Sequence, residues 1–108
     1  MSCKIKVKKL NSAYLLKISG RMVSDDASKV ALTIEKCFKK KLETIVVDLT
    51  EIEYIDSHGL GVFVFAWRNG LEVGKKLCFY NPQGFVEEMF NETKLISILE
   101  FVDNLENL

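Results

Sequence analysis

The first part of the chain has the two-residue period of β-strands. Charged and apolar residues alternate over residues 4–10, as in an edge strand with one face toward water. A turn at Asn11 and Ser12 leads to a second alternating segment, which ends at Gly20. The short connection between the two segments predicts a β-hairpin.

From residue 27 to residue 41 the period changes to that of an amphipathic helix. Acidic Asp25 and Asp26 open this helix and the lysines at 39–41 close it, an arrangement that the helix dipole favours. The apolar stripe that we expect to pack on the sheet consists of Ala27, Val30, Ala31, Ile34, Cys37 and Phe38.

The middle of the chain joins a strand to a second helix. Residues 45–47 are β-branched and apolar, which is typical of a buried strand, and Asp48 and Thr50 are predicted to turn the chain toward solvent. A short apolar run at 52–55 follows, and from Leu60 the pattern is helical. The helix residues predicted to face the sheet are Leu60, Phe63, Val64, Trp67 and Leu71, whereas Val62, Phe65, Ala66 and Asn69 point elsewhere.

The last third of the chain predicts shorter elements. Gly70 and Gly74 mark the end of the second helix, and residues 77–80 form a short strand. Asn81 and Pro82 are predicted to start a third helix, with Asn81 as its cap. Its inner side is predicted to comprise Phe85, Val86, Met89 and Phe90. Residues 98–102 are assigned as a last short strand only by the family resemblance described below, and residues 103–108 are predicted to begin a final helix or to fray.

The resulting order β-β-α-β-α-β-α-β predicts one α/β domain over residues 1–108, with a mixed sheet of four to five strands covered by helices. A chain of 108 residues with 48% hydrophobic residues is ordinary globular material. Fifteen basic and fifteen acidic residues cancel, so we expect no direct nucleic-acid or membrane partner. The start lacks a secretory signal and no apolar run is long enough to span a bilayer, so we expect a cytoplasmic protein. Its three cysteines have no metal spacing and are interpreted as incidental or buried thiols.

Candidate chemistry is concentrated where the second helix begins. Ser57 is predicted as a helix N-cap, because its hydroxyl can accept a hydrogen bond from a backbone N–H of the first turn. The unpaired N–H groups and the positive end of the dipole also favour an anion such as phosphate at this place. Gly59 and Gly61 are poor helix formers, and the simplest reason for them is close approach of another backbone or a partner surface.

Enzyme sites are not supported by the same residues. Asp56, Ser57 and His58 are the residue types of a serine-hydrolase triad, but sequence neighbours cannot reach its geometry. A nucleophile-elbow motif and phosphate-loop or dinucleotide glycine patterns are missing from the sequence. One histidine and scattered cysteines supply no metal cluster, so we expect neither catalysis nor a cofactor or metal.

The segment DLTEIEYIDSHGLG at residues 48–61 resembles the signature of the STAS domain, the family of bacterial anti-sigma factor antagonists. Its aspartate-serine pair is followed by a Gly-Leu-Gly helix start, and the remaining elements follow the family's order along nearly the whole chain. The resemblance implies that Ser57 is phosphorylated by a serine protein kinase that doubles as an anti-sigma factor. It also implies that a serine phosphatase reverses the modification, and that the chain regulates by exchange of partners, without catalysis.

One segment departs from the family pattern. Many relatives read Gly-Glu-Leu-Asp at the end of the second strand, with the aspartate near the phosphorylated serine, whereas this chain has Gly-Arg-Met-Val at residues 20–23. Either Asp25 or Asp26 takes over the acidic role after a small shift, or the role is lost. The simpler interpretation is that Ser24 and Asp25 are helix caps.

The helix after the phosphorylated serine takes part in partner docking in this family, so the resemblance implies a contact surface here. The contact candidates are Asp56, Ser57, His58, Gly59, Leu60, Gly61, Val62 and Phe65. Coverage of Val62 and Phe65 by neighbouring elements is the alternative. Two alternative functions also remain open: a constitutive scaffold subunit of a signalling complex in which Ser57 is only a cap, and a small nucleotide-binding or hydrolytic domain.

Overall fold

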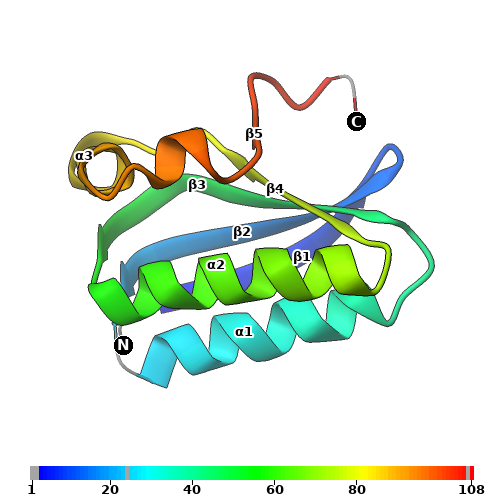
Figure 1. Cartoon of the computed structure of the whole chain (residues 1–108). Coiled ribbons are helices and arrows are strands. Elements are labelled where there is room, and N and C mark those ends of the chain that lie inside the picture. Colours follow the sequence, from blue (N-terminus) through cyan, green and yellow to red (C-terminus); the bar gives the residue numbers. More distant parts are fainter. Residues whose placement is uncertain (1–2, 24, 107) are drawn as a thin grey trace.

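The computed structural model describes residues 3–23, 25–106 and 108 and contains one five-stranded sheet. The elements in chain order are β1 (Cys3–Leu10), β2 (Ala13–Met22), α1 (Asp25–Phe38), β3 (Thr44–Ile55), α2 (Ser57–Glu72), β4 (Lys76–Tyr80), α3 (Gly84–Glu92), a 3-10 turn at Leu95–Ser97 and β5 (Phe101–Val102). The strands lie in the order β1-β2-β3-β4-β5, with β1 antiparallel to β2 and the other pairs parallel. The predicted fold class, element order, mixed sheet and hairpin are therefore confirmed (Figure 1).

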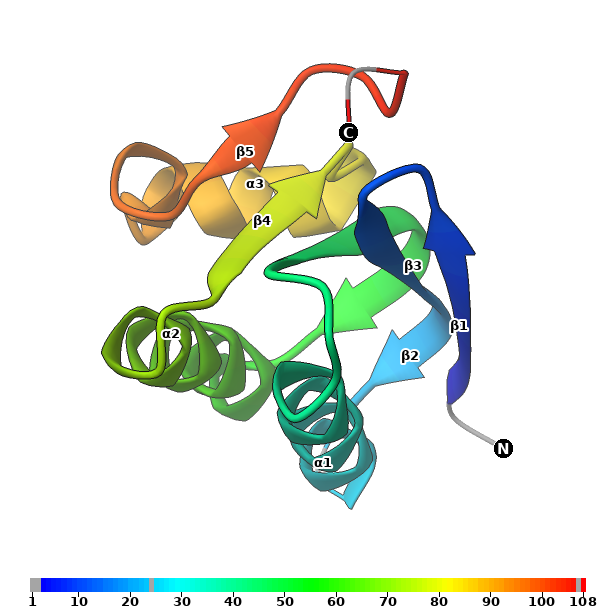
Figure 2. The same ribbon diagram turned by 90° about the vertical axis from the view of Figure 1, so that its right-hand side faces the viewer.

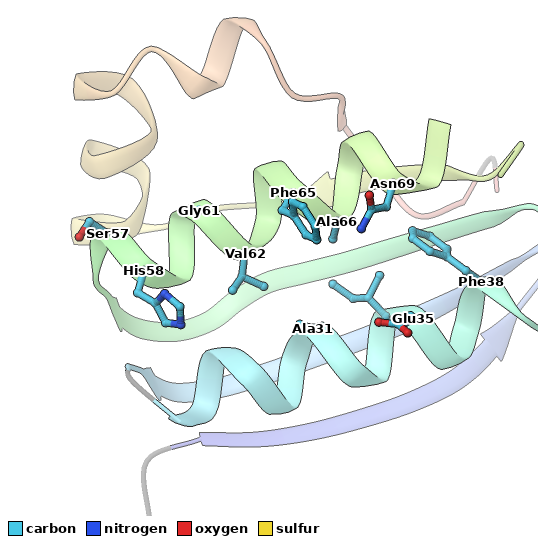
Figure 3. A pocket seen from close by; sticks show the side chains of 11 residues that line it. Ala31, Glu35, Phe38, Ser57, His58, Gly61, Val62, Phe65, Ala66 and Asn69 are labelled. Atoms are coloured by element: carbon cyan, nitrogen blue, oxygen red, sulfur yellow. The ribbon is translucent and has the colours of Figure 1, made fainter. Parts of the chain in front are cut away.

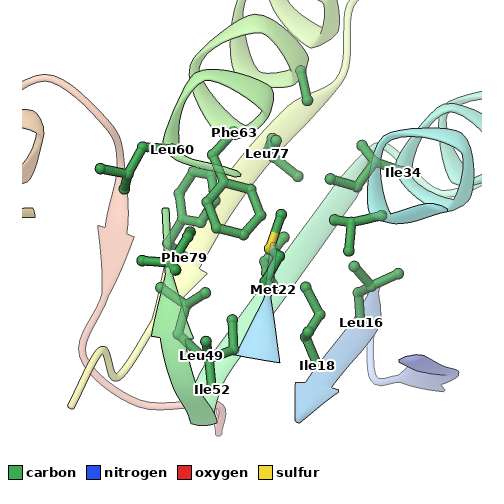
Figure 4. Packing of buried hydrophobic residues seen from close by; sticks show 14 of the residues in the cluster. Leu16, Ile18, Met22, Ile34, Leu49, Ile52, Leu60, Phe63, Leu77 and Phe79 are labelled. Carbon is green, nitrogen blue, oxygen red and sulfur yellow. The ribbon is translucent and has the colours of Figure 1, made fainter. Parts of the chain in front are cut away.

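The helices α1 and α2 lie side by side against one face of the sheet (Figures 1 and 2). Between the helices and the sheet lies the main core, where side chains from both helices interdigitate with those of β2, β3 and β4 (Figure 4). Four phenylalanines, Phe63, Phe79, Phe90 and Phe101, continue this core to α3 and β5, with ring centroids 5.1–6.4 Å apart. This packing fixes the direction of α2 relative to the sheet.

A smaller core lies around Ala13, Leu15, Val46 and Cys78. Leu105 and Leu108 from the C-terminal segment pack against it. The prediction for residues 103–108 was a final helix or a frayed end, and the described part of this segment contains no helix. These residues instead cover apolar surface of the sheet.

Two strands are longer than predicted. β2 continues past Gly20 to Met22, because Gly20, at φ 91°, accommodates irregularities in the pairing with β3. β3 runs without a break through Asp48, which is 6% exposed. The Asp48 carboxylate accepts hydrogen bonds from the backbone N–H of Thr50 at 3.0 Å and from its hydroxyl at 2.6 Å. This local pairing satisfies the buried charge, so the chain does not turn toward solvent there.

The ends of two helices also differ from the prediction. α1 covers Asp25–Phe38, so Asp25 is its first residue and not its cap, and the lysines at 39–41 follow the helix. Ser24, the other predicted cap, lies outside the described residues. α3 begins at Gly84 with Gln83 as its cap, because Asn81 has a left-handed backbone (φ 57°) and its side chain donates to the Thr50 hydroxyl at 3.1 Å.

The sheet-facing side of α2 was predicted only in part. Leu60 and Phe63 are buried, but Leu71 is 55% exposed, whereas Ala66, which was predicted to point elsewhere, is 7% exposed. The reason is the neighbouring α1, which covers the side of α2 that carries Ala66. Gly70 belongs to the same contact, since a Cβ added there would lie 2.9 Å from the Phe38 ring.

Two apolar residues of the last third lie outside the core against expectation. Phe85, predicted on the inner side of α3, is 41% exposed. It stacks on Tyr54 outside the main core. The last strand is confined to Phe101–Val102, and Ile98, predicted to belong to it, is exposed.

Candidate functional site

The start of α2 is capped by Asp56. Asp56 has an extended backbone (φ −98°, ψ 178°), and its side chain accepts a hydrogen bond from the Gly59 N–H at 2.8 Å. Ser57 is the first residue of the helix itself. The prediction of Ser57 as the N-cap is therefore wrong by one residue, because the neighbouring aspartate makes the bond that a cap residue supplies.

The side chains of Ser57 and His58 point in different directions. Both residues are exposed. The Ser57 hydroxyl points outward from the helix end, away from α1, whereas the His58 ring points toward α1 (Figure 3). Because Asp56 supplies the cap, the Ser57 hydroxyl is accessible without loss of the capping bond to the helix.

The two glycines of the first turn have different environments. A Cβ added to Gly59 would lie 2.7 Å from a side-chain carbon of Ile55 and 3.3 Å from the carbonyl oxygen of Met22. The predicted close approach is thus confirmed for Gly59, which seats the helix on the ends of β2 and β3. No described atom lies within 4 Å of a Cβ built on Gly61, so this position leaves open surface beside Ser57.

A hollow of about 400 Å³ runs between α1 and α2 next to Ser57. Two of the predicted contact residues, Val62 and Phe65, contribute to it: Phe65 is 66% exposed, and Val62 is partly buried against the main core. The lining residues from α1 were not predicted, because the sequence does not reveal which helix lies beside α2. The lining residues are Ala31, Ile34, Glu35, Phe38, Ser57, His58, Gly61, Val62, Phe65, Ala66 and Asn69 (Figure 3).

The two candidate acidic neighbours occupy different environments, and neither lines the hollow. Asp26 is 7% exposed and contacts Cys3 of β1. Burial raises the pKa of the Cys3 thiol, and the charge and hydrogen bond of Asp26 raise this pKa further. Asp25 is exposed in the first turn of α1. The carboxylate that lines the hollow is Glu35.

An arginine and two aromatic rings form a stack near the start of α2. The guanidinium carbon of Arg21 lies 4.4 Å from the centre of the Tyr54 ring. The other partner of Tyr54 is Phe85 of α3, whose ring is nearly parallel, 5.0 Å away and inclined by 9°. Sequence reasoning missed this stack because its members come from three separate elements. The only signal was Arg21 itself, in the segment that departs from the family pattern.

Residues 3–23, 25–106 and 108 show neither a metal site nor a membrane-spanning helix. These residues contain no group of three or more potential metal ligands close enough to hold an ion. All three cysteines are free, and Cys37 and Cys78 are buried, as predicted. In the part of the chain that the structure describes, no helix combines the length and the apolar character needed to span a bilayer.

Comparisons with known proteins agree with the signature at residues 48–61. The model of the STAS domain family matches residues 4–108. The chain is 29% identical over 107 residues to the anti-sigma-B factor antagonist of Listeria monocytogenes, covering 98% of this chain and 93% of that protein.

Solved structures agree with the fold. The unphosphorylated form of the anti-sigma factor antagonist SpoIIAA has a TM-score of 0.80 at 16% identity and covers 96% of this chain and 90% of its own. The phosphorylated form of the Bacillus cell fate determinant SpoIIAA has a TM-score of 0.73 at 15% identity, with coverages of 96% and 94%. These likenesses confirm the mixed-sheet α/β fold.

Proposed function

The chain belongs to the STAS domain family, and from this membership we propose that it is a binding protein controlled by phosphorylation, not an enzyme. In its unmodified form it binds an anti-sigma factor that is also a serine protein kinase, and this binding releases a sigma factor or a similar effector. Phosphorylation of Ser57 abolishes the binding, and a serine phosphatase restores it.

Two relatives support this proposal. The Listeria monocytogenes relative is an anti-sigma-B factor antagonist, and SpoIIAA has been solved in an unphosphorylated and a phosphorylated form. The aspartate-serine pair and the Gly-Leu-Gly helix start at residues 56–61 supply the matching residues in this chain.

The observation that carries the proposal is the division of tasks between Asp56 and Ser57. Asp56 holds the first turn of α2 through the Gly59 N–H, while Ser57 is exposed. A phosphate on the Ser57 hydroxyl therefore leaves the capping bond in place. The positive end of the α2 dipole also favours the added negative charge.

The switch itself is electrostatic. Phosphorylation adds about −1.5 to −2 charges beside the Asp56 carboxylate, at a surface that loses water when a partner binds. A partner surface without a matching cation is repelled by this charge. Because a loss of 1.4 kcal/mol lowers affinity about tenfold, one unfavourable charge at the centre of an interface is sufficient.

The proposed docking surface comprises the exposed start of α2 and the hollow beside it. Ser57, His58 and Gly61 line one end of this hollow, and Val62 and Phe65 extend it along α2. Asp56 directly precedes Ser57 in the chain and belongs to the proposed surface without lining the hollow. Leu60 and Gly59 are buried and hold the helix in place. The side chain of Phe65 is the most exposed large apolar group of the surface, so it is the main candidate for a partner contact.

The proposal is tested in native lysate with three baits: the wild-type chain, Ser57→Ala and Ser57→Asp. We expect the first two to retain the same serine kinase and Ser57→Asp to release it. With ATP, mass spectrometry is expected to find phosphate on Ser57 of the wild-type chain. Equal retention by all three baits, or stoichiometric phosphate on another residue with Ser57 unmodified, contradicts the proposal.

A further inference from the structure

We propose that Arg21 binds the phosphate carried by Ser57 in the same chain. This inference rests on the proposed phosphorylation of Ser57 and adds the cation that the phosphate meets within the protein. It makes Arg21 a positioning residue for the modified state.

Negative side chains outnumber positive ones around Ser57. The surroundings are defined by the last three residues of β2 and β3, by Asp56 and by the first turns of the three α-helices. The charged side chains in this set, together with its one histidine, are Arg21, Asp25, Asp26, Glu53, Asp56, His58 and Glu87. Carboxylates predominate, so their charge opposes the phosphate that the α2 dipole favours, and a cation that pairs with the phosphate offsets this repulsion. Arg21 is the one permanently charged cation in this set, all of whose residues the structure describes.

Arg21 lies at the end of β2 that is next to the start of α2. Arg21 pairs with Tyr54 in the register of β2 and β3, and Tyr54 precedes Ser57 by three residues. The carbonyl oxygen of the next residue, Met22, would lie 3.3 Å from a Cβ on Gly59, so the end of β2 touches the first turn of α2. Arg21 therefore lies one residue before the backbone carbonyl that reaches the helix turn carrying Ser57.

The Arg21 side chain is placed so that it can accept a new anionic partner. It is exposed, and its guanidinium lies over the Tyr54 ring, which is itself supported by Phe85. Among the described residues no carboxylate forms an ion pair with it. A guanidinium stacked on a ring keeps the N–H donors at its edge available, and their planar fork matches the oxygens of a phosphate.

The consequence for the switch is a change in the surface that a partner meets. Without phosphate, the surface presents an open serine and a cation on an aromatic stack. With phosphate, the cation is drawn toward position 57, and the phosphate is held in one direction. Part of its charge is then neutralised within the protein, which reduces the repulsion from Asp56 and Glu53.

The pairing is tested on protein with phosphoserine installed at position 57 during synthesis, so that no kinase is needed. The second ionisation of the phosphate is followed by ³¹P NMR as a function of pH. A nearby cation favours the dianion, so Arg21→Gln is expected to raise the pKa of the phosphate by about half a unit or more. Arg21→Lys should give an intermediate pKa. The control is Arg68→Gln, which removes the chain's other arginine, an exposed residue in the second half of α2, and should leave the pKa unchanged.

A second readout uses the wild-type sequence alone. The side-chain Nε–Hε resonance of Arg21 is expected to shift between the serine and phosphoserine forms, while that of Arg68 does not. The pairing is wrong if the phosphate of Arg21→Gln titrates like that of the wild type, or if the Arg21 resonance does not move. Either result leaves the proposed function intact, whereas failure to find a kinase acting on Ser57 overturns the proposed function without affecting the measured pairing.

Discussion

Two adjacent residues have different tasks at the start of α2. Asp56 accepts the Gly59 N–H at 2.8 Å and thereby stabilises the helix, whereas Ser57 presents its hydroxyl to solvent. A hydroxyl that also capped the helix would be a poor modification site, because the added group would compete with the capping bond. Under the proposed phosphorylation, this separation lets position 57 gain charge while the capping bond of the helix stays in place.

This separation predicts a difference in stability between two alanine variants. Asp56→Ala loses the cap and is expected to lower the free energy of unfolding by about 1 kcal/mol. Ser57→Ala changes an exposed side chain and is expected to stay within about 0.5 kcal/mol of the wild type. Urea unfolding of the three proteins measures both differences. A loss for Ser57→Ala as large as that for Asp56→Ala would assign the cap to Ser57.

The contact between Cys3 and Asp26 predicts how the thiol reacts with pH. Burial and Asp26 both raise the pKa of Cys3, so less thiolate is present at a given pH than in an exposed cysteine. Asp26→Asn removes the negative charge and lowers this pKa. The pH–rate profile of Cys3 alkylation should therefore move to lower pH, with a roughly threefold faster reaction below the pKa if the pKa falls by about half a unit.

The matched control for this experiment is Asp25→Asn. Asp25 is the exposed neighbour and is not among the groups that shift the pKa of Cys3. Peptide mass spectrometry distinguishes Cys3 from the two buried cysteines. Equal profiles for the two variants would show that Asp26 does not act on the thiol.

At the scale of elements, the pairing of α1 with α2 creates the surface that we assign to the partner. The apolar side of α2 would be an open surface by itself. Ala31, Glu35 and Phe38 of α1 form the opposite wall, so that the two helices together enclose a hollow. The small residues Ala66 and Gly70 bring the two helices together at one end, where Gly70 meets the Phe38 ring. Phe65 stays exposed on the rim.

This arrangement predicts that Phe65 contributes to binding and not to folding. Phe65→Ala is expected to weaken binding of the captured kinase by about tenfold or more, because exposed aromatic residues beside a hollow are frequent binding hot spots. Leu71→Ala is the control, since Leu71 lies on the same helix with a similar exposure, 55% against 66%, and does not line the hollow. Isothermal titration calorimetry measures both affinities, and thermal unfolding checks that both variants are folded. If the two substitutions weaken binding equally, the hollow is not the docking site.

At the scale of the whole molecule, the order of elements could be predicted because most elements have a clear period or a turn residue at their boundary, and the family resemblance supplied the last strand. The continuity of β3 could not be predicted, because the hydrogen bonds from Thr50 to the Asp48 carboxylate form only in the folded strand. The cap of α2 was misassigned because aspartate and serine are both good caps, and only the backbone angles distinguish them.

The parts of the site that come from distant elements were also beyond sequence reasoning. The wall of the hollow from α1 and the stack of Arg21, Tyr54 and Phe85 depend on which elements become neighbours. The residues at 56–61, by contrast, are contiguous, so their motif could be recognised directly.

The central claim is that one phosphate on Ser57 controls partner binding. The most direct test is the dissociation constant of the kinase captured by the unmodified chain, measured against the chain with serine and with phosphoserine at position 57. The account predicts binding at least about tenfold weaker for the phosphoserine form. Equal dissociation constants for the two forms would contradict it.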